Sequence, residues 1–289
     1  MRITVFTPTF NRAYIIEQLY ESLGRQSFHD FEWLVVDDGS TDETKALFSG
    51  WCKRENRFPI RYYRQENGGK CSAINKALDL AKGELFFTVD SDDYLTDDAL
   101  QKIDEWERKL PGTKSFCGVA GNLGRTGADT PNTLFPNGYC DGTLLDRYAH
   151  VDGERALVFY TDVHKKYKYP IFKDEKFMTE AVAWNRMAND GYSMRFYNDI
   201  IWVYDYKEDG LTKAGNSVFL RNPKGYWLWL NEKNRFLSAT PAKRFKTLYT
   251  YCCDLSAYYE TKEISLFTKV PKGIICLIFN IHRIRKRVH

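Results

Sequence analysis

The chain has 289 residues, of which 43% are hydrophobic and 16% aromatic, and its formal net charge is +4. This length suits one large α/β domain with a smaller appendage. A net charge this small does not by itself indicate nucleic-acid binding, and we expect no nucleic-acid partner. Seven cysteines without a Cys-x-x-Cys spacing indicate reduced thiols in a reducing compartment.

The N-terminal residues enter a predicted strand directly and lack the apolar core of a signal peptide. No window offers the ~20 apolar residues that a membrane-spanning helix needs. We therefore expect a cytoplasmic protein, or one that is attached to a membrane face.

Strands and helices alternate through the first part of the chain. Short runs rich in β-forming residues predict strands at 3–7, 33–36, 60–64 and 83–89. Helical spacing predicts a helix over 13–26, a second helix that ends at about 51, and a third over about 73–81. This alternation indicates an α/β fold with a largely parallel sheet and right-handed crossovers. The carboxyl ends of these strands would share one rim, which is where open α/β sheets bind ligands.

Polar residues follow each predicted strand, and this rim would gather Phe10, Asp38, Lys70, Asp90 and Asp92. Asp90 and Asp92 are separated by one residue, so both can reach one hard cation, and carboxylate oxygens suit Mg²⁺ or Mn²⁺ better than Zn²⁺. In the alternative interpretation, the acids of this segment only turn the chain and cap the helix that begins near Asp98.

The next part of the chain gives less regular signals. We expect a helix over 98–109, strands at 116–121 and 156–161, and a helix over 180–188. The polar segment 122–152 is interpreted as an acceptor-side flap. Asn198-Asp199 is predicted to be a hairpin turn between strands at 194–197 and 200–206, and His164 with its two following lysines is expected on the solvated surface.

From about 218 the sequence changes to aromatic and basic helices. The last apolar run is too short to span a bilayer, and it ends in the basic residues Arg283, Arg285, Lys286 and Arg287. This combination predicts a helix that lies at an anionic membrane surface. The alternative is a final helix that packs near Trp227 and Trp229.

Four motifs together resemble those of the inverting family 2 glycosyltransferases: Pro-Thr-Phe-Asn at 8–11, Val-Val-Asp-Asp-Gly-Ser-Thr-Asp at 35–42, Asn-Gly-Gly-Lys at 67–70 and Asp-Ser-Asp-Asp at 90–93. The resemblance covers about 2–212. It implies a GT-A fold, with a mostly parallel, Rossmann-like nucleotide-binding sheet flanked by helices. The catalytic domain would be 1–214, with a nucleotide-sugar half at 1–121 and an acceptor half at 122–214, and 215–289 would form a helical extension.

The resemblance also implies roles for single residues. Phe10 would lie beside a uracil, Asp38 would accept a hydrogen bond from the base, Asp90 would face the ribose, and Asp92 would hold Mn²⁺ or Mg²⁺. The full set of implied donor-binding residues is Pro8, Thr9, Phe10, Asn11, Asp38, Asn67, Lys70, Asp90, Ser91 and Lys207.

Inversion requires a base that accepts the proton of the attacking hydroxyl. The family commonly places this base in a Glu-Asp pair at the start of a helix, and the matching position here is Glu180, followed by Ala181 in place of the second acid. Asp174 and Glu175 remain alternatives. Glu180 could instead serve only the electrostatics of the helix N-terminus.

The implied reaction moves a hexose or a derivative from a nucleoside-diphosphate sugar, expected to be a uridine diphosphate sugar, to a hydroxyl of a glycan acceptor. A lipid-linked oligosaccharide is the expected acceptor, in bacterial capsule, exopolysaccharide or O-antigen synthesis at the inner face of the cell membrane. A sugar-nucleotide pyrophosphorylase is one alternative, although the first strand leads into no glycine-rich phosphate loop. A non-catalytic glycan- or lipid-binding protein is the other. The sugar, the acceptor and the linkage depend on pocket shape.

Overall fold

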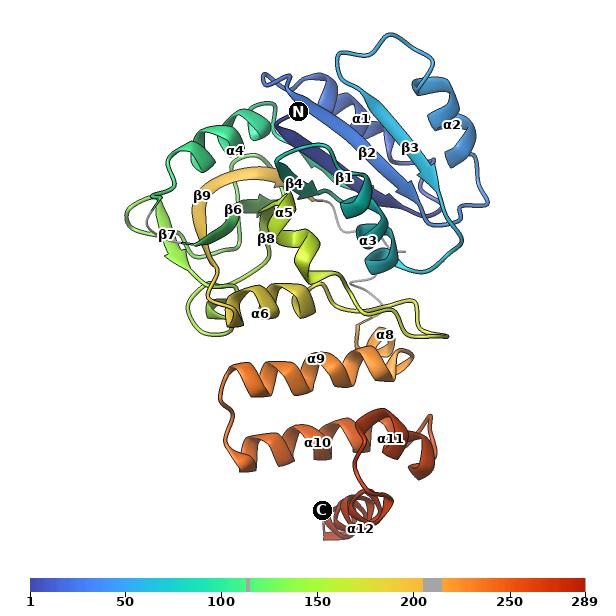
Figure 1. Ribbon diagram of the computed structural model, residues 1–289. Helices are drawn as coiled ribbons and strands as arrows, with labels where there is room; N and C mark the ends of the chain where they lie inside the picture. Colours follow the sequence, from blue (N-terminus) through green and yellow to red (C-terminus); the bar gives the residue numbers. More distant parts are fainter. Residues whose placement is uncertain (113–114, 205–214, 289) are drawn as a thin grey trace.

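The computed structural model describes residues 1–112, 115–204 and 215–288. Within these residues, nine strands form one sheet in the order β3-β2-β1-β4-β8-β6-β9-β5, and β7 pairs with β9 beside this path. Helices flank the sheet, and further helices are stacked below it in the view of Figure 1. The α/β class and the GT-A type of architecture agree with the sequence prediction.

The first half of the sheet is parallel. Its strands are β1 (Ile3–Thr9), β2 (Phe31–Asp37), β3 (Ile60–Arg64) and β4 (Leu85–Thr88). The helices that connect them are α1 (Glu17–Gly24), α2 (Thr44–Trp51) and α3 (Lys70–Leu80). Because these strands run the same way, their carboxyl ends meet at one edge, as predicted.

The second half of the sheet is mixed. β8 (Arg155–Tyr160) is antiparallel to both β4 and β6 (Phe116–Gly124), whereas β6 is parallel to β9 (Ser193–Val203). The short strands β5 (Tyr94–Leu95) and β7 (Tyr139–Gly142) are antiparallel to β9. The helical segments here are α4 (Ala99–Arg108), the 3₁₀ turns η1 (Asp146–Tyr148) and η2 (Lys165–Tyr167), α5 (Thr161–His164) and α6 (Ala181–Asn189).

The predicted hairpin turn at Asn198-Asp199 is wrong, because β9 runs through both residues. Its register with β6 shifts between Ala120 and Asn122. The side chain of Asn198 bonds to the backbone of Phe135, with its Oδ1 accepting from N at 2.8 Å and its Nδ2 donating to O at 2.8 Å. A polar pair that resembled a turn therefore sits at an irregularity inside a strand, where its amide binds a neighbouring loop.

The segment 122–152 is also more ordered than a structureless flap. β6 continues to Gly124, and β7 and η1 both lie within the segment.

His164 differs most from its expected environment. Its side chain is buried rather than solvated, and it lies against the rings of Phe86 and Phe159. Burial lowers the pKa of His164 to about 3, so the ring is neutral at physiological pH. Of the two lysines that follow, Lys166 is exposed.

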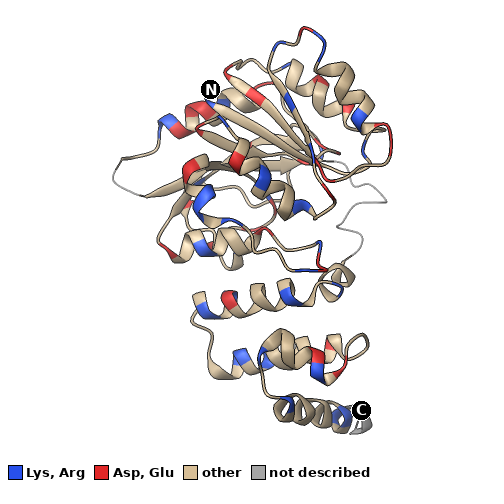
Figure 2. Cartoon of the chain, turned by 45° about the vertical axis from the view of Figure 1, so that its right-hand side comes forward, with Lys and Arg blue, Asp and Glu red and all other residues tan. Residues whose placement is uncertain are grey.

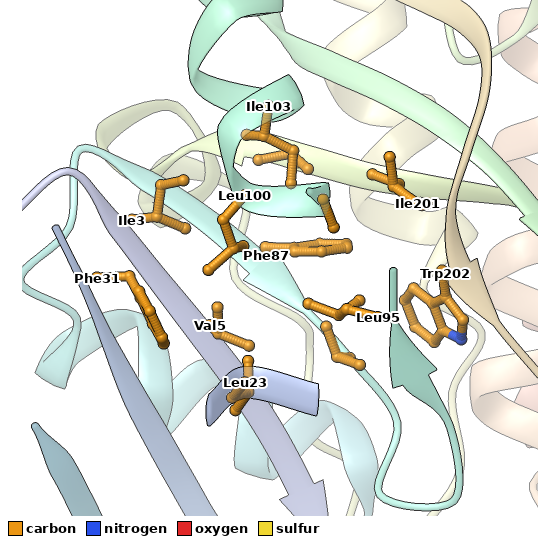
Figure 3. Packing of buried hydrophobic residues seen from close by; sticks show 14 of the residues in the cluster. Ile3, Val5, Leu23, Phe31, Phe87, Leu95, Leu100, Ile103, Ile201 and Trp202 are labelled. Carbon is orange, nitrogen blue, oxygen red and sulfur yellow. The ribbon is translucent and has the colours of Figure 1, made fainter. Parts of the chain in front are cut away.

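Two hydrophobic cores lie on the two faces of the sheet. One packs α1, α2 and α4 against the sheet, and Figure 3 shows part of it, with Phe87 and Leu100 among residues from β1, β2 and β9. The other packs α3 and α6 against the opposite face, through residues such as Ile74 and Val182. The same strands contribute residues to both cores, so helices pack on both faces of the sheet and hold its edge in position.

The C-terminal helices form a stack that extends away from the sheet (Figure 1). They are α8 (Asn216–Leu220), α9 (Pro223–Phe236), α10 (Pro241–Leu255), α11 (Thr261–Thr268) and α12 (Lys272–Val288). α9 contacts α6, α10 contacts α9, and α12 contacts α10 and α11. A third core, centred on Tyr251, Leu255 and Ile264, holds the stack together. The domain boundary after 214 stays a prediction.

The last helix has two apolar faces. Ile275 and Ile278 are fully buried in the third core, as the packed alternative expected, whereas Ile274, Leu277 and Ile284 are exposed. Within the described residues, no single helix is long and apolar enough to cross a membrane. Thr261–Thr268 and Lys272–Arg285 pass that test only as a pair bent by 120°.

Candidate active site

A cleft of about 1380 Å³ lies at the carboxyl-terminal edge of the parallel strands. It brings together residues from all four motifs of the first half and from the start of α6. The predicted residues that line it are Pro8, Thr9, Phe10, Asn11, Asp38, Asn67, Lys70, Asp90, Ser91, Asp92 and Glu180. Lys207 lies outside the described residues.

The end of β1 offers an apolar ring and a polar atom to the cleft. Phe10 is 45% exposed, which is far more than a core aromatic would be. The Thr9 side chain is buried, and within the described part of the chain its Oγ1 has no hydrogen-bond partner. A buried hydroxyl without a partner is costly, so a ligand that bonds to it would gain affinity. These features suit a flat, polar-edged group such as a nucleobase.

Asp38 connects three strand ends. Its backbone N donates to Thr9 O at 2.8 Å, and its carboxylate accepts from Gly68 N at 2.9 Å and Gly69 N at 2.7 Å. Asn11 has a similar role, because its Oδ1 accepts from Thr41 N at 2.7 Å. Both side chains therefore hold loops in place, and their contacts with a nucleotide stay a prediction.

Gly69 makes the closest approach between the two halves of the site. It has φ +86°, and a Cβ at this position would lie 1.7 Å from Lys176 O. The next residue but one, Cys71, donates its thiol to Met178 O at 3.2 Å. The start of α3 is thus held tightly against the segment that leads into α6, and this brings Glu180 next to Lys70.

Lys70 joins two carboxylates across the cleft. Its Nζ lies 2.7 Å from Asp90 Oδ1 and 3.1 Å from Glu180 Oε2. Burial alone would lower the pKa of Lys70, but the two carboxylates raise it well above the usual value, so the ammonium stays charged. Asp90, which is predicted to face the ribose, and Glu180, the predicted base, therefore both contact the ammonium of Lys70.

The acids after β4 repel one another. Burial and then the charge of Asp90 raise the pKa of Asp92, and burial together with Asp90 and Asp92 raises the pKa of Asp93 to about 8. Asp93 Oδ2 accepts a hydrogen bond from Trp202 Nε1 at 2.8 Å. Asp93 is thus held toward β9 at the edge of the cleft that Asp90 and Asp92 also line. In the capping alternative these acids turn the chain and cap the next helix. α4 begins at Ala99 with Asp98 as its N-cap residue, so Asp92 and Asp93 lie too far before the helix to cap it, and Asp98 itself makes no capping hydrogen bond through its side chain.

The two alternative bases are placed differently from Glu180. The carboxylate of Glu175 accepts from Lys224 N and Gly225 N, both at 2.8 Å, and so caps the start of α9. Asp174 lies at an exposed turn with φ 68°. Geometry therefore favours Glu180, and its role as base stays a prediction.

Asp90 and Asp92 fit a divalent cation that shares its ligands with a substrate. Within the described residues, no group of three His, Cys, Asp or Glu side chains could form a protein-only cage. Burial and then the negative charge of Asp90 raise the pKa of Asp92. A cation bound by both carboxylates would relieve the repulsion between them. Mg²⁺ is commonly held in this way, by one or two carboxylates together with phosphate oxygens and waters.

Two parts of the cleft wall were missed from the sequence. α8 and the residues around it contribute Ser217, Phe219 and Asn222, although the catalytic part was predicted to end before them. Arg147, Tyr148 and Trp184 line another part. Trp184 could have been found, because it lies four residues after Glu180 on a predicted helix and so shares its face. The α8 residues carried no comparable signal.

Comparison with known proteins identifies the family. The model of Glycosyl transferase family 2 matches residues 4–128. This chain contains a family 2 glycosyltransferase domain. The putative teichuronic acid biosynthesis glycosyltransferase TuaG of Bacillus subtilis is 32% identical over 148 residues, which are 51% of this chain and 52% of that protein. The chain thus matches about half of the length of this relative.

Solved glycosyltransferases share the fold of this chain. S. aureus TarS 1–349 in complex with UDP-GlcNAc has a TM-score of 0.61 at 19% identity, over 92% of this chain and 86% of that one. The mannosyltransferase PcManGT from Pyrobaculum calidifontis, in complex with GDP-Man and Mn²⁺, has a TM-score of 0.58 at 18% identity, over 98% and 80%. The GT-A fold and the match to glycosyltransferase family 2 agree with the resemblance inferred from the motifs.

Substituting Gly69 with alanine tests the contact between α3 and the segment before α6. The new Cβ would collide with Lys176 O, which is backbone and cannot rotate away, so Glu180 should move relative to Lys70. We expect sugar transfer, or hydrolysis of the nucleotide-sugar donor, to fall by roughly 10²-fold, because small displacements at a reacting centre have effects of this size. Gly24→Ala is the matched control, since a Cβ at Gly24 meets nothing within 4 Å. Equal activity of both variants would contradict this role of Gly69.

Proposed function

We propose that this chain transfers a hexose or a hexose derivative from a nucleoside-diphosphate sugar to a hydroxyl of a glycan acceptor, with inversion at the anomeric carbon. The observation that carries this proposal is the contact of Lys70 with both Asp90 and Glu180 in one cleft. This contact supports the proposal because Asp90 and Glu180 then lie close enough together to contact one substrate. The complexes of TarS with UDP and with UDP-GlcNAc support a uridine diphosphate sugar as the donor.

Each side chain has a step in this reaction. Phe10 covers one face of the base, and the hydroxyl of Thr9 bonds to its edge. Asp90 faces the ribose, and Lys70 offers its charge to the diphosphate. The carboxylate of Glu180 accepts the proton of the acceptor hydroxyl as that oxygen bonds to the anomeric carbon, and the bond from this carbon to the nucleoside diphosphate breaks. Lys70 positions Glu180 before the donor arrives, which places the base near its working geometry.

Asp92, together with Asp90, would hold a divalent cation, Mn²⁺ or Mg²⁺. When bound, such a cation supplies positive charge that neutralises the leaving diphosphate. PcManGT was solved with Mn²⁺, which supports this choice of cofactor.

The setting we propose is bacterial surface-polysaccharide synthesis at the inner face of the cell membrane, with a lipid-linked acceptor. The name of TuaG places that relative in teichuronic acid biosynthesis. A further relative in Campylobacter jejuni is named as a glucosyltransferase acting on an undecaprenol-linked glycan.

The exposed face of α12 supports attachment to an anionic membrane. Ile274, Leu277 and Ile284 are 44%, 58% and 62% exposed and recur at helical spacing. Figure 2 shows Lys and Arg along this helix, which contains no Asp or Glu. Apolar side chains with flanking cations suit the boundary between anionic headgroups and acyl chains.

Replacing Glu180 with glutamine tests the base. The amide keeps the size of the side chain but cannot accept the proton, so transfer should slow by roughly 10²-fold or more while donor affinity is kept. The rates are measured with a panel of nucleotide sugars and the affinity by calorimetry. Asp174→Asn is the matched control and should transfer at the parental rate, because Asp174 is exposed at its turn. A parental rate for Glu180→Gln would remove Glu180 from the mechanism.

Replacing Asp92 with asparagine tests the metal. Mn²⁺ should raise the affinity of the parental chain for UDP by about tenfold or more, and the variant should lose this gain because it lacks one anionic ligand. Calorimetry with Mn²⁺ and with a chelator measures the difference. Asp97→Asn, at an exposed position, should behave as the parent does. If chelator left the UDP affinity of the parent unchanged, the metal role would be wrong.

Exchanging Leu277 and Ile284 for serine tests the membrane face without disturbing the buried face of α12. Burial of each such side chain stabilises binding by about 1.5–3 kcal/mol when complete, so the double variant should bind anionic vesicles at least about tenfold more weakly. Co-sedimentation at low salt measures this. The control variant carries serine in place of Leu134 and Ile171, which are each 56% exposed elsewhere on the surface. Equal binding of the two double variants would argue against attachment through α12.

A further inference from the structure

A cluster of cations and aromatic rings from η1, α6 and α9 meets the cleft through three of its residues, and Lys233 joins it through a contact with Tyr148. The guanidinium of Arg147 lies 4.7 Å from the ring centroid of Trp184 and 5.0 Å from that of Tyr148. The ammonium of Lys233 also contacts Tyr148, at 4.1 Å from the ring centroid, and it lies 5.1 Å from the ring centroid of Trp229. Arg147, Tyr148 and Trp184 face the cleft itself. We refer to Arg147, Tyr148, Trp184 and Lys233 as the cationic wall.

The two cations of the wall have no acidic partner among the described residues, and the nearby acids are already engaged. Glu232, next to Lys233 in the chain, binds Arg186 through two hydrogen bonds of 2.9 and 2.8 Å. Asp146, next to Arg147, accepts from Thr143 N at 2.6 Å and Thr143 Oγ1 at 3.0 Å. Aromatic faces hold cations by only about 0.5–2 kcal/mol, so they do not replace a carboxylate.

Excess positive charge at the wall also affects its titrating groups. Burial and then Arg147 lower the pKa of Lys233, apart from an opposing contribution of Tyr148. Burial alone would raise the pKa of Tyr148, but Arg147, hydrogen bonds from Asn185 and Trp229, and Lys233 bring it below the usual value. A bound anion would relieve this repulsion.

The position of the wall assigns its ligand to the acceptor. Trp184 lies four residues after Glu180, and side chains at this spacing are about 5–6 Å apart on one helix face. The hydroxyl that attacks must contact Glu180, whereas the nucleotide is expected at Phe10, Asp38 and Asp90 on the sheet edge. A group that binds beside Trp184 is therefore joined to the attacking hydroxyl by only a few bonds.

We propose that the cationic wall is a subsite for a phosphate group of the acceptor, with Trp184 as a platform for the sugar or polyol next to that phosphate. This proposal rests on the proposed function and adds the chemical class of the acceptor. The planar fork of Arg147 suits two phosphate oxygens, and Lys233 adds a point charge. The phosphate could belong to a phosphodiester of a polyol-phosphate chain or to the pyrophosphate of a lipid-linked glycan, and both offer the same anionic oxygens.

Binding of defined probes tests the subsite. The probes are a soluble glycerol-phosphate oligomer, a short-chain prenyl pyrophosphate and, as the neutral reference, glycerol. They are titrated calorimetrically into the full chain in the presence of UDP, and into the variants Arg147→Gln, Lys233→Gln and Arg147→Lys. Arg235 belongs to α9, as Lys233 does, but lies outside the cationic wall, so Arg235→Gln is the matched control. Thermal unfolding shows that each variant is folded.

At least one phosphorylated probe should bind, and glycerol should not. Each glutamine variant should weaken binding by about tenfold, which is the usual effect of losing one charge-assisted hydrogen bond, whereas Arg235→Gln should not. Arg147→Lys should lose less than Arg147→Gln, because it keeps the charge. Preference for the oligomer or for the prenyl pyrophosphate identifies the source of the phosphate.

Three results would overturn the subsite: no binding of either phosphorylated probe, equal losses in Arg147→Gln and Arg235→Gln, or a loss of UDP affinity as large as the loss of probe affinity. The last result would assign the wall to the donor. Failure of the proposed function looks different, because then no nucleotide sugar is bound or hydrolysed although the phosphorylated probes still bind.

Discussion

The ion pairs of Lys70 with Asp90 and Glu180 connect parts of the chain that otherwise have separate tasks. Asp90 belongs to the parallel half of the sheet, and Glu180 begins a helix of the mixed half. A cation between two half-buried carboxylates is favourable only if both remain within contact distance. The position of α3, the close approach at Gly69 and the path of the segment 176–180 all serve to keep these three side chains together.

The two halves of the sheet support this contact differently. The parallel half presents its loops at one edge, and loops such as the turn at Gly68 are tied down by carboxylates such as Asp38. The mixed half surrounds the other side of the cleft with short strands, 3₁₀ turns and α6. Its walls therefore come from residues that are distant in sequence, among them Tyr148 and Phe219. Such an arrangement lets the wall formed by the mixed half vary while the loops of the parallel half keep their geometry.

Much of the cleft edge formed by the parallel half could be predicted from the sequence, because its signals are local. Asp90 and Asp92 follow a buried strand directly, and Asn67 to Lys70 precede a helix, so topology alone brings them together. The side formed by the mixed half depends on tertiary contacts that leave no local pattern. His164 stands beside lysines yet is buried, and Asn198-Asp199 is polar yet lies within a strand. The α8 residues reach the cleft only because α9 packs on α6.

The order of the C-terminal helices has a geometrical consequence for substrate access. α6, α9, α10 and α12 are stacked in succession (Figure 1). Packed helices have axes 8–10 Å apart, so the axis of α12 lies roughly 24–30 Å from that of α6, and the exposed face of α12 lies beyond it. If that face rests on a bilayer, the stack holds the cleft at a fixed distance from the membrane surface. The height of the stack would then set how far an acceptor must extend from the membrane surface to enter the cleft.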